Sequence, residues 1–188
     1  MRPVGVERIA AAFPSQLAAD VAAVCAVVPP ATTQRPTPAD IGAITLAGER
    51  LRIPQRIYWA EPTENAARSL RERERLILSA IYSRHHDGFV RERALREVIR
   101  SREQFVQPFI VQLLGEYVLE IIQIIEAELP EPILADYAAF LEGNVEFLEL
   151  TRARATSYWN AYARSQFPRL REYPALRVLD RLAFWTSR

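Results

Sequence analysis

The sequence contains no lysine, so all 24 of its Lys/Arg positions are arginines. This absence removes every mechanism that needs a lysine amine, including the phosphate-binding loop, Schiff-base chemistry and the strand lysine of protein kinases. A glycine-rich phosphate cradle, a nucleophile elbow and a paired metal-binding helix motif are missing as well. The common sequence signatures of nucleotide-dependent and hydrolytic enzymes are therefore not present in this chain.

Cysteine is also scarce, because Cys25 is the only one. A single thiol excludes an internal disulfide and any multi-cysteine zinc or iron-sulfur site, and it favours a reducing compartment. The apolar stretch near the N-terminus is interrupted by Asp20 and preceded by Glu7, which does not fit a secretory leader. No apolar run approaches the length of a membrane span. We expect a cytoplasmic protein without membrane contact, and the abundant Ala, Arg and Pro are typical of a GC-rich bacterial genome.

The residues that are present predict an all-α fold with a small N-terminal β-hairpin. Apolar residues recur at helical spacing in most segments, whereas residues 44–54 alternate apolar and polar around Ala47 and Gly48. We expect N-terminal helices and the hairpin, residues 1–58, to pack on a helical-repeat body, residues 59–188, as one cooperative domain. Residues 31–40 are a loop by composition.

Local signals set the expected helix boundaries in the body. Thr63 is a candidate N-cap for a helix over 64–84, and Ser101 with Gln104 resembles a capping box. Pro108 lies near the start of the following helix. The helix over 117–129 is apolar on most of its circumference and is expected to be the most buried element. Further helices are predicted over 133–142 with a left-handed stop at Gly143–Asn144, over 145–164 and over 175–184.

One helical hairpin in this body resembles a HEAT repeat. Asp87 lies in a tight turn, Val90 and Arg91 follow, and Ala94 and Val98 continue at helical spacing. The resemblance covers roughly residues 64–125 and implies stacked antiparallel helix pairs. It also implies that the turn aspartate and the arginine stabilise the turn between the helices, and that the small residue allows close helix approach.

Charge is segregated along the chain although the formal net charge is only +1. No arginine occurs between Arg102 and Arg152, where acidic residues accumulate instead. One interpretation is internal complementarity, in which acidic helices pair with basic neighbours; the other is an acidic band that docks a basic partner. The candidate docking residues in this band are Glu116, Glu120, Glu126 and Glu128.

The string RHHDG is the most suggestive local motif for chemistry. His85, His86 and Asp87 could supply metal ligands or a general base, with Arg84 and Arg91 holding an anionic substrate. Neighbouring side chains on a turn point in different directions, however, and the chain has no third histidine. We therefore expect a turn-stabilising network of Asp87, nearby amides and Arg91, with no metal and no cofactor.

A second candidate lies in residues 151–164. On a helix, Arg154, Tyr158 and Tyr162 fall on one side at four-residue spacing, and Trp159 lies beside them. Arginine, tyrosine and tryptophan are enriched at binding hot spots. The alternative is that these aromatic residues belong to the core and have their polar ends satisfied.

Together these features favour a non-enzymatic protein that binds another macromolecule, a basic protein in the first instance. An immunity- or antitoxin-like role is one concrete version. The acidic middle argues against nucleic acid, because phosphate binding needs a continuous positive field. An enzyme using the His-His-Asp turn and a homo-oligomeric structural component remain the alternatives.

Overall fold

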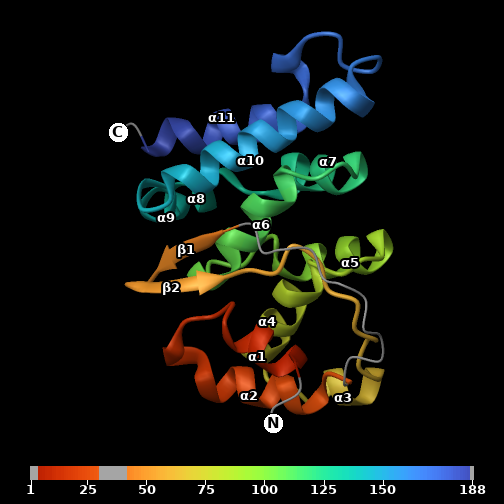
Figure 1. Cartoon of the computed structure of the whole chain (residues 1–188), viewed down its shortest axis with the longest axis vertical. Coiled ribbons are helices and arrows are strands. Elements are labelled where there is room, and N and C mark those ends of the chain that lie inside the picture. Colours follow the sequence, from red (N-terminus) through yellow and green to blue (C-terminus); the bar gives the residue numbers. More distant parts are fainter. Residues whose placement is uncertain (1–3, 30–41, 187–188) are drawn as a thin grey trace. The chain divides into compact units, whose positions relative to one another are not determined.

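A computed structural model describes residues 4–29 and 42–186, and it is mostly helical with one two-stranded antiparallel sheet (Figure 1). The predicted fold class, all-α with a small N-terminal hairpin, is confirmed. The loop predicted over residues 31–40 lies outside the described residues. The chain divides into two compact units, residues 1–98 and residues 99–188, and each is treated separately below. The predicted division after residue 58 falls inside the first unit.

Over residues 4–29 and 42–98, the first unit contains two N-terminal helices, the hairpin and three further helices. Its elements are α1 (Val4–Ala10), the 3-10 turn η1 (Ser15–Leu17), α2 (Ala18–Val27), β1 (Ala43–Leu46), β2 (Glu49–Arg52), α3 (Glu64–Arg68), α4 (Glu72–Tyr82) and α5 (Gly88–Val98). α4 packs against both α2 and α5. The predicted core face of this helix pair is buried at Ile77, Ile81, Leu95 and Val98.

The hairpin follows the predicted alternation. Ile44 and Leu46 of β1 and Leu51 of β2 are buried, and the neighbouring positions face solvent. Ala47 and Gly48 form the turn with φ angles of 52° and 77°, as a two-residue type I′ connection requires. The Arg52 N–H donates to the Ala11 carbonyl at 2.8 Å. An isolated hairpin is marginally stable, and this bond ties the hairpin to the residue that follows α1.

The prediction of a single helix over residues 64–84 is wrong, because the structure has two helices there, α3 and α4. Thr63 caps α3 by accepting from the Ala66 N–H at 3.3 Å, as predicted. The Ser69 hydroxyl then donates to the Ala66 carbonyl at 2.7 Å, and Arg71 is extended with ψ 165°. Glu74 accepts from the Arg71 N–H at 2.7 Å and starts α4. Local side-chain bonds thus end one helix and begin the next despite continuous helical periodicity.

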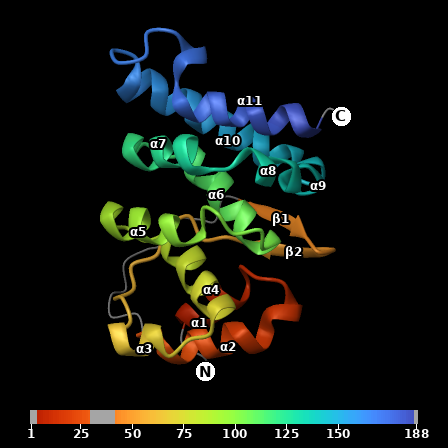
Figure 2. The same cartoon turned by 180° about the vertical axis from the view of Figure 1, so that it is seen from behind.

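The second unit is entirely helical over its described residues (Figure 2). Its elements are η2 (Gln104–Val106), α6 (Gln107–Leu114), α7 (Leu119–Glu128), α8 (Glu131–Leu134), η3 (Ala135–Tyr137), α9 (Ala138–Glu142), α10 (Val145–Tyr158), the π-helical segment η4 (Trp159–Ala163), η5 (Leu170–Glu172) and α11 (Pro174–Thr186). α11 lies along α10 and packs on α7 and α9. Buried positions of α11 include Val178, Leu179 and Leu182.

Three local predictions in this unit need correction. α6, and not α7, is the most buried helix: all its residues are buried, whereas α7 buries only Ile121, Ile122 and Ile125 and exposes a polar outer face. Gly143 has a φ of −76°, so α9 does not end in a left-handed residue.

The region before α6 also differs in part from the prediction. Ser101 accepts from the Glu103 N–H instead of forming a capping box with Gln104. Pro108 does lie at the start of α6, where the missing N–H carries no penalty.

α4 packs against α5 in the first unit, and α6 packs against α7 in the second. None of the described helices is long and apolar enough to cross a membrane.

Candidate functional site

The His-His-Asp turn, residues 83–87, is held by two buried arginines. Arg84 has no exposed surface, and it donates from Nε to the Pro54 carbonyl at 3.2 Å and from Nη2 to the Gln55 carbonyl at 2.9 Å. Arg91 is also buried and donates from Nη1 to the carbonyls of His85 and His86 at 2.8 and 2.9 Å. Both guanidinium groups thus satisfy backbone carbonyls of the turn and the linker before α3.

His85 is held as a neutral ring by burial and by the hydrogen bond that its Nδ1 accepts. Its Nδ1 accepts from the Asp87 N–H at 3.1 Å, so the ring proton resides on Nε2, which lies 3.0 Å from the Trp59 carbonyl and donates to it. Burial lowers the pKa of His85, although the Trp59 carbonyl acts in the opposite direction. With both nitrogens occupied, this ring holds the turn together and offers no lone pair to a metal or substrate proton.

The other two members of the motif point elsewhere. His86 is exposed and stacks on Tyr58 with a ring separation of 5.1 Å. Asp87 caps α5 by accepting from the Phe89 N–H at 2.8 Å, and this bond is the main reason that its pKa is lowered. Nowhere in the described parts of the chain do three or more His, Cys, Asp or Glu side chains form a possible metal site. The geometry matches the turn network that the sequence predicted, with Arg91 bound to carbonyls and Asp87 to an amide.

The four predicted acidic docking residues do not share one accessible surface. Glu116 is only 2% exposed, so its carboxylate is not a surface group. Glu126 pairs with Arg177 of α11, whose Nε lies 2.5 Å from the carboxylate. Glu128 is half-buried, and Glu120 is exposed. Arg102–Asp136 and Arg181–Glu131 also join the acidic segment to basic neighbours, and Arg152 of α10 pairs with Asp180 of α11.

The predicted arginine-tyrosine side of α10 is brought together, and it gains a member from another element. Tyr158 lies 6.1 Å from the Tyr162 ring in a stacked arrangement and 5.9 Å from the ring of Tyr117, which precedes α7. Arg154 lies over the Tyr158 ring at 5.9 Å. Tyr117 is 53% exposed and Tyr162 is 72% exposed. We call Tyr117, Tyr158, Tyr162 and Arg154 the tyrosine face.

Gly115 explains why Tyr117 reaches this face. A Cβ at position 115 would lie 3.3 Å from Thr151 Cγ2 and from the Thr151 carbonyl oxygen, so the turn after α6 approaches α10 too closely for a side chain. Arg154 closes the contact by donating from Nε to the Gly115 carbonyl at 3.2 Å. The sequence pattern of α10 could not identify Tyr117, because its proximity depends on this packing of two distant segments.

Trp159, which was predicted with the other aromatic residues, belongs to a different contact. Its indole N–H donates to the Phe167 carbonyl at 2.8 Å, and Arg164 lies over its ring at 5.5 Å. It begins the π-helical segment that contains Tyr162. Such segments are rare and are frequent at functional sites.

Comparison with protein-family models, with curated proteins and with solved structures finds no match to this chain.

Proposed function

We propose that this is a non-enzymatic binding protein that recognises another protein through the tyrosine face. The observation that carries the proposal is the contact of the half-buried Tyr158 ring with two exposed rings, stacked on Tyr162 and tilted against Tyr117. Aromatic rings of this size normally gain stability by burial, so three neighbouring rings that remain in contact with water form a surface suited to a partner.

Tyrosine is well suited to this role because it offers a large rigid contact area and a hydroxyl at a low conformational cost. Its ring face also attracts cations. A basic partner therefore remains the expected class, with its arginine or lysine side chains placed over the exposed rings of Tyr117 and Tyr162. An immunity- or antitoxin-like role in a bacterial cell is one setting that this chemistry fits.

The experiment is affinity capture from extract of the source cell, with wild-type protein and a Tyr117→Ser/Tyr162→Ser variant as baits. Both positions are exposed, so the double variant is expected to keep the fold, which circular dichroism would check. Phe184→Ser is the matched control, because Phe184 is 53% exposed and lies outside the face. A stoichiometric partner retained by wild type and by the control, but lost by the double variant, is the expected result.

Equal capture by all three baits would contradict the tyrosine face as the binding surface. The solution mass of the same three proteins distinguishes binding of a different protein from the alternative, self-association of this chain. A wild-type dimer that the double variant converts to a monomer would identify a second copy of the chain as the partner.

A further inference from the structure

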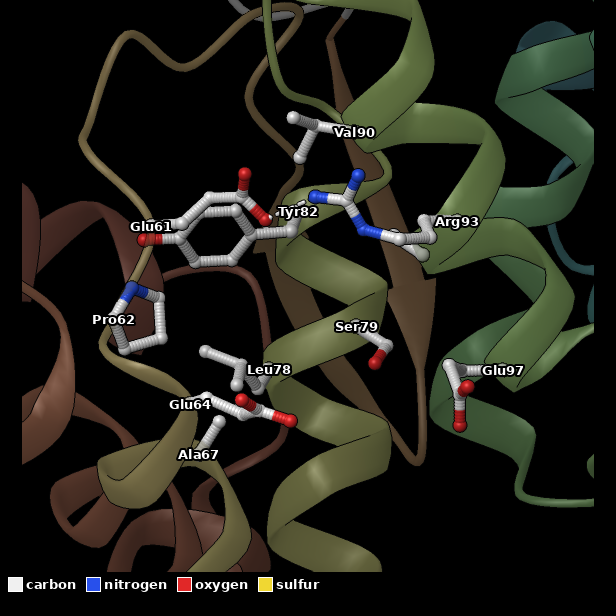
Figure 3. Close-up of a pocket in the computed structure, with 11 residues that line it drawn as sticks. Glu61, Pro62, Glu64, Ala67, Leu78, Ser79, Tyr82, Val90, Arg93 and Glu97 are labelled. Atoms are coloured by element: carbon white, nitrogen blue, oxygen red, sulfur yellow. Dashed lines mark hydrogen bonds and ion pairs between the residues drawn. The ribbon is translucent and has the colours of Figure 1, made fainter.

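An open pocket with a volume of about 530 Å³ lies in the first unit between α3, α4 and α5 (Figure 3). Its apolar lining comes from all three helices and the linker before them, and consists of Pro62, Ala67, Leu78, Val90 and Ala94. Pockets of this size that combine an apolar floor with a few polar groups are typical of sites for small ligands.

Carboxylates surround this floor on several sides. Glu61 comes from the linker, Glu64 from the start of α3 and Glu97 from α5, whereas Arg93 is the only basic residue among those that line the pocket. The charge of Arg93 is already matched, because its Nη2 lies 2.6 Å from Glu61. Glu64 pairs with Arg68, which is not part of the lining.

Glu97 is the carboxylate that remains available. It is exposed, and no hydrogen bond or ion pair joins it to any part of the chain that the structure describes. Ser79, which also lines the pocket, adds a hydroxyl oxygen from α4. The lining therefore has an excess of negative charge and of hydrogen-bond acceptors above an apolar surface.

The floor is held in place without a ligand. The Tyr82 hydroxyl donates to the Ala60 carbonyl at 2.6 Å, which fixes the linker against α4. Thr63 caps α3 beside Glu64, as described above. A site that is already formed avoids the ordering cost of binding.

We propose that this pocket binds an arginine side chain of a partner protein, with the methylene stem on Leu78 and Ala94 and the guanidinium group at Glu97. Arginine has an apolar methylene stem, which matches the apolar floor, and a charged guanidinium group, which matches the carboxylate of Glu97. Its guanidinium group is weakly hydrated and has five donors spread over a plane, so it can serve Glu97 and the Ser79 hydroxyl together. The pocket lies outside the tyrosine face, and this inference does not rest on the function proposed for that face.

The test uses n-butylguanidinium chloride as the probe and amide NMR shifts of the full-length protein as the readout. The neutral analogue n-butylurea has nearly the same shape and lacks the charge. We expect n-butylguanidinium to shift amides of α4 and α5 around Leu78 and Ala94, and to bind about five- to tenfold more tightly than n-butylurea.

Glu97→Gln and Glu72→Gln form a matched pair of variants. Both glutamates are exposed and both substitutions remove one negative charge, but Glu72 does not line the pocket. Glu97→Gln is expected to weaken n-butylguanidinium binding about two- to fivefold, and Glu72→Gln to leave it unchanged. Absence of shifts at the pocket, equal binding of the neutral analogue, or equal effects of the two variants would each overturn the proposal.

Discussion

At the scale of single residues, His85 combines burial with a hydrogen bond that requires the neutral ring, because its Nδ1 accepts from the Asp87 N–H. Because burial lowers the pKa of His85 below its unfolded value of about 6.5, its contribution to stability is complete above that pH and is lost as the pH falls. We therefore expect the free energy of unfolding to decrease on acidification from neutral pH. NMR titration of the ring protons, assigned with His86→Gln, would check this, and a His85 pKa at or above 6.5 would contradict it.

Asp87 acts at the same turn with a carboxylate whose charge is stabilised by amides of α5. Its lowered pKa means that its contribution to stability is complete above the unfolded value of about 3.9 and is lost as the pH falls through the folded pKa. Asparagine also caps helices but cannot ionise. The stability difference between wild type and Asp87→Asn should be largest at neutral pH and should shrink at pH 3, as measured by urea unfolding. A difference that does not depend on pH would exclude this role for the charge.

At the scale of elements, the hairpin turn contains a residue that is not ideal for its conformation. Ala47 has a φ of 52°, a region that costs a side chain with a Cβ roughly 1 kcal/mol unless it is asparagine or aspartate. Ala47→Asn should therefore stabilise the protein by up to about 1 kcal/mol. Gly48→Ala should destabilise it by strain alone, because a Cβ there would meet no atom within 4 Å. Thermal unfolding of both variants would test the pair, and equal shifts in Tm would rule out the conformational explanation.

The contact between α10 and the turn after α6 gives a second element-scale prediction. Gly115→Ala would introduce a Cβ at 3.3 Å from Thr151, so we expect a loss of about 1–2 kcal/mol and a displaced Tyr117. Gly143→Ala is the control, since its nearest contact would be 3.6 Å and its φ of −76° suits alanine. Urea unfolding measures the stability of each, and the NMR chemical shifts of the Tyr117 ring protons report the displacement. A Gly115→Ala protein as stable as Gly143→Ala would show that the turn adjusts freely.

The element boundaries that the sequence predicted correctly are each marked by a capping, helix-start or turn residue at the boundary itself. Thr63, Pro108 and the Ala47–Gly48 turn mark boundaries by their own backbone chemistry, and these boundaries are confirmed. The break between α3 and α4 lies inside an unbroken periodic pattern, so periodicity could not reveal it. For the candidate site, helical spacing was enough to group Arg154, Tyr158 and Tyr162. Tyr117 and the pocket at Glu97 depend on contacts between distant segments, which one sequence does not specify.

At the scale of the whole chain, the segregated charge is matched in part by internal pairing. In the second unit, arginines of α10 and α11 contact carboxylates that come from α7, α8 and α11 itself. Two of these pairs, Arg177–Glu126 and Arg181–Glu131, join the acidic stretch to the basic stretch that follows it, and they agree with the first of the two interpretations drawn from the sequence. Arginine suits this use because its planar group can hold a carboxylate through two donors.

This internal pairing predicts different outcomes for two glutamates on the same helix. Glu126→Gln removes the partner of Arg177 and should lower the free energy of unfolding by about 0.5 kcal/mol, the range of partly exposed ion pairs. Glu120 is exposed, and no hydrogen bond or ion pair joins it to the residues that the structure describes, so Glu120→Gln should leave stability unchanged. Urea unfolding at low and high salt measures both, and the Glu126→Gln effect should diminish at high salt because the pair is screened. If instead both variants keep full stability but lose a basic partner, the acidic stretch is a docking surface and the internal pair is incidental.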